Sequence, residues 1–379
     1  MRDLGCDKIS LVSECKAATF HSLTSCSMTL LKPFCLQLIT IFMIMISYIA
    51  NLSAQSLLKA RPIDTLYIGN NPYKWSGRIY SQTKYNRLNI NSDSGSTNKV
   101  FFTPNTKFAI GLGASYYNLF LDLGANVNFT RKSDTVSQTK NADLLGSIYA
   151  IQHIFDYTFQ LYQGFFADTV KRLLGEENPE TFRQDLRIFN VGANYNYLFN
   201  YRRFSFTAPF IGIQLQKKSA GSPMAGVFFS YYDLRADSGI LPVKLSSRFN
   251  EKANISEANV LSAGLLGGYA YTLVLPLHFF ITLSANPGIS LNIGDAKSIK
   301  YYSIGHPATI SFKLLSRNAV GYTGTRWYGF FSWVADANYV PIGYGNRLIY
   351  NVGKVKLLVG YRFIKDDNSP RKLLRLKGS

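Results

Sequence analysis

Strict two-residue alternation of apolar and polar side chains constrains the fold of this chain more than any other feature. In segment 119–129, LFLDLGANVNF, every odd position is apolar, while the even positions include Asp122, Gly124, Asn126 and Asn128. A β-strand places successive side chains on opposite faces, so the segment predicts a strand with one apolar face. Run 107–116 alternates in the same way, and the two residues at 117–118 leave room only for an antiparallel hairpin.

The same alternation recurs along the rest of the chain and predicts an all-β protein. Thirteen strands are expected, at 74–82, 106–117, 119–130, 143–151, 154–163, 186–199, 203–213, 223–236, 258–274, 278–293, 308–321, 325–337 and 354–364. A bacterial single-chain membrane barrel has an even number of strands, so one of these assignments must be wrong. Segments 85–91 and 346–352 are further strand candidates, and twelve or fourteen strands are expected.

Two architectures use strands of this kind. In a periplasmic lipocalin-like barrel the apolar face is the interior, whereas in an outer-membrane barrel it faces lipid and the polar face lines the lumen. Strands of ten to fourteen residues suit a tilted membrane crossing, and aromatic residues gather near strand ends, as in Tyr116-Tyr117 and Trp327-Tyr328. We therefore expect an antiparallel transmembrane β-barrel over 74–364, in the outer membrane of a Gram-negative bacterium.

The N-terminal region predicts export. Segment 36–50 is a largely apolar run of fifteen residues that follows Lys32 and precedes small residues at 53 and 54, as in a cleaved signal peptide. Met28 is a suitable start, so 1–27 is interpreted as an over-called or ancillary N-terminus and 28–54 as the signal. A single N-terminal membrane helix is the alternative. Segment 55–73 is then a periplasmic segment, and 365–379 a basic tail. All four cysteines precede residue 36, which excludes a disulfide framework in the barrel.

Candidate functional residues are few. The polar strand faces nominate possible lumen-lining side chains, namely Asp122, Asn126, Gln160, Asn194 and Arg362. His153, His278 and His306 fall in expected turns or loops rather than beside a serine on a shared face, so no catalytic residue is nominated. No histidines and carboxylates converge in sequence, and no metal or cofactor site is expected. A barrel-borne enzyme that modifies lipid or lipopolysaccharide is retained as an alternative to a structural or transport barrel.

The positive charge predicts lipid rather than nucleic acid as the partner. The chain carries a formal net charge of +19, but its basic residues are scattered along strands and turns, which argues against a nucleic-acid interface. The basic cluster at 371–377 suits anionic lipid headgroups or lipopolysaccharide phosphates, although a merely soluble periplasmic tail fits equally. A barrel fold also implies the barrel-assembly machinery as a partner.

Several short stretches resemble a known family. They are TPNT at 103–106 leading into GLGASY at 111–116, YQGFF at 162–166, DSGILP at 237–242, GYAYT at 268–272, the final GYRF at 360–363, and the motif of Gln216, Lys217, Lys218, Ser219, Ala220, Gly221 and Ser222. Together they resemble the Bacteroidota envelope proteins of domain-of-unknown-function family 4421, over about 62–364. The resemblance implies export and an outer-membrane barrel, and it brings no catalytic residues.

Overall fold

A computed structural model describes residues 63–365, except for 71–72, 93–98, 106–107, 117–118, 128–138, 169–181, 213, 248 and 300–305. The predicted signal peptide, its preceding segment and the basic tail beyond 365 lie outside the described residues. No helix in the described part of the chain is long and apolar enough to cross a membrane.

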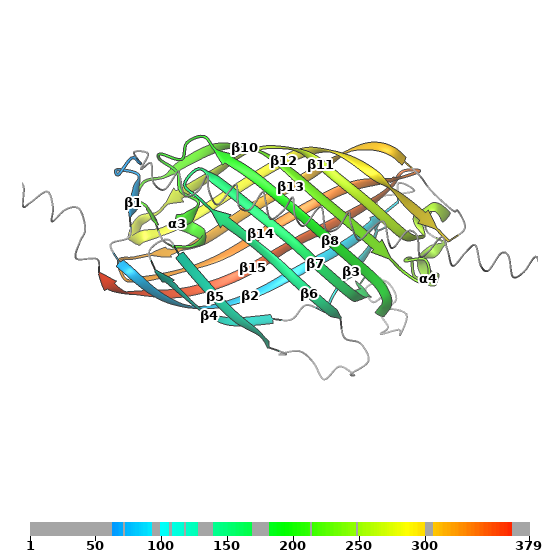
Figure 1. Cartoon of the computed structure of the whole chain (residues 1–379), viewed down its shortest axis with the longest axis horizontal. Helices are drawn as coiled ribbons and strands as arrows, with labels where there is room; N and C mark the ends of the chain where they lie inside the picture. Colours follow the sequence, from blue (N-terminus) through cyan, green and yellow to red (C-terminus); the bar gives the residue numbers. More distant parts are fainter. Residues whose placement is uncertain are drawn as a thin grey trace, which may run out of the picture. The chain divides into compact units, whose positions relative to one another are not determined.

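The described chain is dominated by one thirteen-stranded antiparallel sheet, shown in Figure 1. Its strands are β2 (Tyr73–Asn91), β3 (Lys99–Thr103), β4 (Phe108–Tyr116), β5 (Leu119–Val127), β6 (Lys140–Tyr149), β7 (His153–Ala167), β8 (Phe182–Leu198), β10 (Ala220–Arg235), β11 (Ile255–Val274), β12 (Phe279–Ser298), β13 (His306–Thr323), β14 (Trp327–Gly343) and β15 (Asn346–Lys365). Pairing of β15 with β2 closes ten of them into a ring, in the order β2, β3, β7, β8 and β10 to β15. The predicted fold class, an all-β antiparallel barrel, is confirmed, but the ring closes with ten strands rather than the expected twelve or fourteen.

Strands β3 and β4 behave as two parts of one strand that is interrupted at 104–107. Leu88 of β2 pairs with Phe102 and Thr83 pairs with Phe108, so the register is almost continuous across the break. Pro104 lies in the break, where its missing N–H costs no ladder bond. On the N-terminal side of the break, β3 pairs with β7 and closes the ring. On the C-terminal side, the β4–β5 hairpin extends the sheet from β2, and β6 extends it from β7. Among the described residues, β5 and β6 each have one paired edge.

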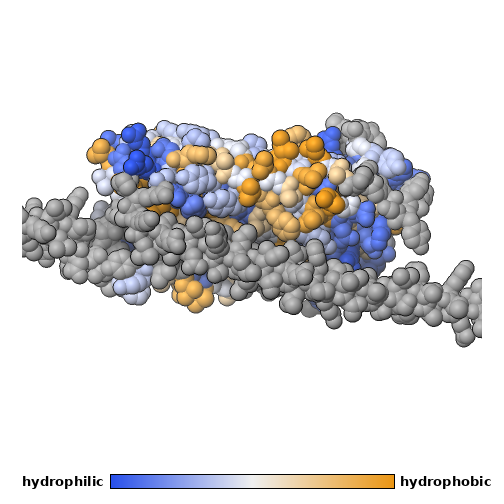
Figure 2. All heavy atoms as spheres, turned by 45° about the horizontal axis from the view of Figure 1, so that its top comes forward, coloured by the Kyte–Doolittle hydropathy of each residue, from blue (hydrophilic) through white to orange (hydrophobic). Residues whose placement is uncertain are grey.

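The apolar strand faces point out of the barrel. Leu123, Leu265 and Ile310 are each 69–70% exposed, whereas Gln160, Asn196 and Thr282 on inward positions are fully buried. Figure 2 shows hydrophobic residues gathered on the outer wall, with hydrophilic residues toward both ends. The outward apolar band is the surface that a lipid-facing barrel requires.

Connections at the two ends of the barrel differ in length. One end, here called the turn end, carries the short links 117–118, 150–152, 275–278 and 324–326, together with the longer segment 199–219. The 3-10 turn η3 (Pro276–His278) lies there. The other end, here called the loop end, carries 92–98, 128–139, 168–181, 236–254, 299–305 and 344–345. Strand β2 begins and β15 finishes at the turn end.

The expected strand at 203–213 is wrong. This segment forms turns and the short helix α3 (Thr207–Phe210), and β9 (Gln214–Gln216) follows it and pairs with β1 (Ile68–Asn70) outside the barrel sheet. Phe204, Phe206 and Ala208 alternate as in a strand, yet the intervening Ser205 is also buried, because the segment folds over the barrel end and both its sides are enclosed. The other twelve expected strands all coincide with observed ones. Segments 85–91 and 346–352 are parts of β2 and β15 rather than separate strands.

Candidate functional site

The barrel lumen is the candidate site, and three layers of side chains fill it. Apolar residues occupy the loop end, charged and amide residues occupy the middle, and aromatic residues beneath α3 occupy the turn end. Each layer is built mainly from the inward positions of the strands, which alternate with the lipid-facing ones.

The connection 236–254 folds into the loop end as a plug. It contains α4 (Val243–Ser246) and the 3-10 turn η2 (Glu251–Ala253). Ile240, Leu241 and Leu245 are at most 3% exposed and pack in one cluster with inward residues of many strands. Tyr232 and Tyr350 stack at 4.3 Å between ring centroids below the plug, and the Ser230 and Tyr350 hydroxyls are hydrogen-bonded at 2.6 Å. The loop end of the lumen is therefore closed by an apolar core.

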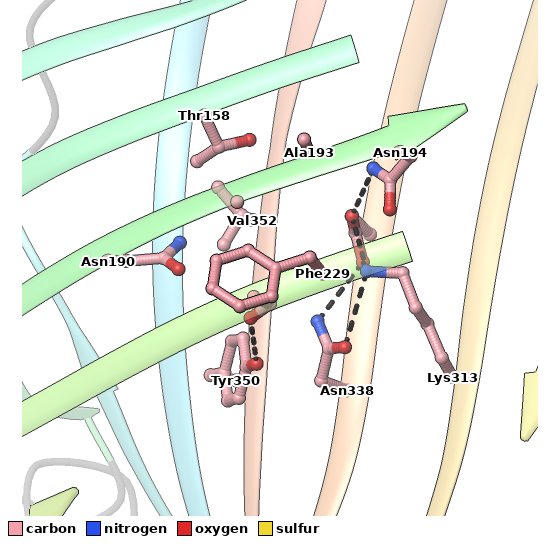
Figure 3. Close-up of a pocket in the computed structure, with 12 residues that line it drawn as sticks. Thr158, Asn190, Ala193, Asn194, Phe229, Lys313, Asn338, Tyr350 and Val352 are labelled. Atoms are coloured by element: carbon pink, nitrogen blue, oxygen red, sulfur yellow. Dashed lines mark hydrogen bonds and ion pairs between the residues drawn. The ribbon is translucent and has the colours of Figure 1, made fainter. Parts of the chain in front are cut away.

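Ion pairs across the lumen fill the middle layer. Arg317 of β13 is fully buried and donates a hydrogen bond to Asp156 of β7 on the far wall. Lys313 Nζ lies 2.6 Å from Asp336 Oδ1, and Asn194 Nδ2 donates to Asp336 Oδ2 at 2.9 Å, as Figure 3 shows. The cavity beside these residues has a volume of about 10 Å³, which is about the space that one water needs.

A second group of ion pairs holds β5 to β2 and β15, which lie beyond β4 in the sheet. Asp122 accepts hydrogen bonds from Arg78 Nε of β2 at 2.6 Å and from Lys356 Nζ of β15 at 2.7 Å. A Cβ at Gly113, the β4 residue paired with Asp122, would collide with both Asp122 and Arg78. The glycine therefore leaves the room that this ion pair occupies.

Strand β6 is held in a comparable way through Asp143. Its carboxylate accepts from Tyr162 at 2.5 Å and from Gln160 Nε2 at 2.9 Å, and Lys84 Nζ of β2 donates to its backbone oxygen at 2.9 Å. Gln160 Oε1 in turn accepts from Asn86 and Asn190. Since no ladder joins β5 to β6 among the described residues, these side-chain contacts tie the two strands to the rest of the barrel.

The turn end is covered by α3 and its flanking residues. Arg362 is fully buried there and donates from Nη1 to Gly324 O at 2.6 Å and from Nη2 to Gly212 O at 2.9 Å. Its guanidinium lies 4.4 Å from the centroid of the Tyr328 ring. Gly212 has a φ of 77°, which an L side chain rarely adopts, so the sharp exit from α3 needs glycine. Beside this cap lies a mainly apolar cavity of about 500 Å³, open at the turn end.

Positive charge exceeds negative charge inside the barrel. The described inward positions carry four carboxylates but seven cations, namely Arg78, Lys84, Lys313, Arg317, Lys354, Lys356 and Arg362. Lys354 makes no ion pair with any described residue. The Nε and Nη1 atoms of Arg317 are buried without a hydrogen-bond partner among the described residues.

The structure places four of the five nominated lumen residues inside the barrel. Asp122, Gln160 and Asn194 belong to the middle layer, and Arg362 belongs to the turn-end cap. Asn126 lies in β5 opposite Ala109, but its side chain is outside the described part of the chain.

The family-like motif 216–222 lies at the turn end rather than in the lumen. Gln216 Nε2 donates to Arg203 O at 2.7 Å and Ser205 N donates to Gln216 Oε1 at 3.0 Å, so this amide holds the fold of segment 203–216. Lys217 N donates to Tyr67 O at 2.7 Å, and Val274 N donates to Ser219 Oγ at 2.9 Å. The motif is an anchor for the cap.

The two histidines whose side chains are described, His153 and His278, both contact tyrosine residues. His153 Nδ1 is hydrogen-bonded to the Tyr195 hydroxyl at 2.8 Å on the outer wall, and His278 lies in the η3 turn against Tyr322. The side chain of His306 is outside the described residues. Within the described ranges, no group of three or more histidines, cysteines and carboxylates could hold a metal ion.

Of the seven inward cations, only Arg362 was nominated from the sequence. Lys313 and Arg317 lie four residues apart on β13, and Lys354 and Lys356 are two apart on β15, so each pair shares one strand face. Their regular spacing on inward faces, beside buried residues such as Leu315, Val352 and Leu358, was the available signal. Which carboxylate each cation meets depends on how the barrel closes.

The family model described as "Domain of unknown function (DUF4421)" matches residues 62–363. The chain belongs to this family. Among curated proteins, none matches it.

Several solved outer-membrane proteins match this chain at low sequence identity and low TM-score. A bacterial polysaccharide outer membrane secretin is 7% identical with a TM-score of 0.31, covering 77% of this chain and 99% of its own. The translocator domain of the autotransporter NalP from Neisseria meningitidis is 9% identical with a TM-score of 0.30, covering 76% and 88%. The P. putida toluene transporter TodX is 8% identical with a TM-score of 0.25, covering 79% and 94%.

Proposed function

We propose that this DUF4421 protein is an integral outer-membrane barrel of structural type, whose lumen is closed rather than an open diffusion pore. The observation that supports a closed lumen is the Arg317–Asp156 ion pair across the lumen, together with the plug and the cap that enclose it at the two ends. Opening a path would break buried ion pairs, and removing one partner of such a pair costs about 3–5 kcal/mol.

The proposed orientation places the turn end in the periplasm and the loop end outside the cell. Outer-membrane barrels have short periplasmic turns and longer external loops, which is the asymmetry of this barrel. The barrel-assembly machinery would then insert the protein, and no reaction is assigned to it. Replacing His153 and His278 is expected to leave the membrane lipid profile unchanged, and an altered profile would favour the lipid-modifying alternative.

Two measurements test the structural proposal. Membrane fractionation should recover the protein only with detergent, and the folded form should migrate apart from the boiled form on a gel. A soluble, heat-insensitive protein would instead support a lipocalin-like binder. In planar bilayers the native protein should give no steady conductance, whereas a constant open-channel current would exclude a closed lumen.

Transport of small anions through a gated lumen is the second candidate. It is favoured by the surplus of inward cations and by Lys354, which has no ion-pair partner among the described residues. Charged rings in a pore select ions of opposite sign, so brief openings that pass chloride in preference to potassium would support this candidate. Bilayer recordings without any openings would favour the purely structural one.

A further inference from the structure

A row of basic side chains crosses the outer wall near the loop end. Strand pairing aligns Lys140 with Gln163, Gln163 with Arg187, and Arg187 with Arg235. Lys140, Arg187 and Arg235 are exposed and point outward, on the same face as the apolar band. They border a groove of about 430 Å³ over β6, β7, β8 and β10.

The charges of this row are incompletely neutralised. Arg235 Nε lies 3.1 Å from Asp233 Oδ2, but neither Lys140 nor Arg187 has an ion-pair partner among the described residues. Arg187 stands directly opposite Arg235, and like charges opposite each other on neighbouring strands destabilise a sheet. An anion bound between them would remove this cost.

The position of the row fits the boundary of a membrane. The next rows toward the turn end contain Leu161, Phe189 and Phe159, and the two phenylalanine rings contact at 5.7 Å between centroids. On β7, Gln163 lies ten positions beyond His153, which packs against Tyr195 and Tyr197. At about 3.3 Å per residue and a tilt of about 40°, these residues span about 25 Å, the usual height of the lipid-facing band. The cations therefore lie at one edge of the band and an aromatic girdle lies at the other.

We propose that this groove binds the phosphate of a phosphorylated glycolipid in the outer leaflet, with its acyl chains along Leu161 and Phe189. The inference rests on the proposed membrane insertion and orientation. Guanidinium and ammonium groups are strong phosphate donors, and apolar side chains directly beneath them match a lipid better than a free anion.

The test uses the full-length protein reconstituted in phosphatidylcholine vesicles, with or without diphosphorylated lipid A. Lipid retained after mild detergent extraction is measured by mass spectrometry. The double variant Lys140→Gln/Arg187→Gln should retain roughly tenfold less lipid A than the native protein, because each basic residue near an anionic surface contributes severalfold to affinity. Arg347→Gln removes an exposed cation from the same rim on β15, outside the groove, and should retain the native amount.

Several outcomes would overturn the proposal. They are equal retention by the double variant, an equal loss in Arg347→Gln, equal retention of dephosphorylated lipid A, and displacement of the lipid by excess inorganic phosphate. The gel migration of each variant before and after boiling shows whether its barrel has folded, so a loss of lipid binding can be distinguished from a loss of the fold. If the double variant does not fold, the single variants Arg187→Lys and Arg187→Gln test the proposal instead. Arg187→Lys should retain lipid A, and Arg187→Gln should not.

Discussion

At the residue scale, the lumen shows how buried charge is tolerated in this barrel. Arg317 is fully buried, yet its Nη2 meets the Asp156 carboxylate, which also accepts from Ser147 at 2.6 Å. A buried pair gains little over apolar residues of the same size, but loss of one partner leaves an uncompensated charge. Such a pair therefore contributes little net stability, although substitution of only one of its partners is strongly destabilising.

Substitution of this pair should show strong coupling. We expect Asp156→Ala and Arg317→Ala each to lower the free energy of unfolding by about 3 kcal/mol, and the double variant to lose less than the sum. Urea unfolding in lipid vesicles measures this through Trp75, Trp327 and Trp333, which are 38–59% exposed on the outer wall. Additive losses would show that the two side chains act independently.

Glycine positions offer a second test at the same scale. A Cβ at Gly113 would meet the Asp122–Arg78 ion pair, whereas one at Gly267 of β11 would meet no atom within 4 Å. Gly113→Ala should therefore lower the free energy of unfolding by about 1–3 kcal/mol. Gly267→Ala should change it by about 0.5 kcal/mol or less. The same unfolding assay applies, and equal effects of the two substitutions would contradict this account of Gly113.

At the scale of the element, segment 203–213 shows that tertiary context can override an alternating sequence pattern. Its alternation of Phe204, Phe206 and Ala208 is that of a strand, but Pro209 and Gly212 favour a turn, and the segment caps the barrel. Counting 203–213 as a strand would place every later turn at the opposite end of the barrel. With the segment removed from the sheet, the short turns at 117–118, 150–152, 275–278 and 324–326 share one end.

The plug helix α4 provides a matched pair of substitutions. Leu245 is 2% exposed in the loop-end core, whereas Val243 on the same helix is 77% exposed. Loss of a buried leucine weakens the plug by about 2 kcal/mol. Leu245→Ser should therefore raise the rate of tryptic cleavage within 236–254 roughly tenfold or more, and Val243→Ser should leave it unchanged. An equal rate in both variants would mean that burial of Leu245 does not hold the plug.

At the scale of the whole molecule, closure of the barrel sets the electrostatics of its interior. Strands that are distant in sequence bring their charges into one enclosed volume, as when Lys356 of β15 meets Asp122 of β5. The resulting excess of positive charge is a property of the lumen rather than of any single strand.

Opening the lumen should reveal this charge. In the linker variant, short Gly/Ser linkers replace the plug at 240–249 and the cap at 204–212, and Arg317 and Asp156 are both alanine, which keeps the positive surplus. This variant is expected to conduct ions in planar bilayers and to pass chloride in preference to potassium. Adding Lys354→Glu should reduce that preference. Lys297→Glu, the same charge change on an exposed outward position of β12, should leave it unaltered. A potassium preference in the linker variant would contradict the role of the inward cations.

The sequence by itself determined most of the strands and showed which face of each strand is apolar and which is polar. Period-two patterning fixes which side chains share a face, and a lipid-facing band needs only one apolar residue in two, so segments such as 119–129 can be interpreted locally. Only the tertiary structure decided which residues meet inside the barrel as plug, ion pairs and cap. Contacts such as Arg317 with Asp156 and Asn194 with Asp336 join positions 161 and 142 residues apart. They depend on sheet register and ring closure, and no local pattern encodes either.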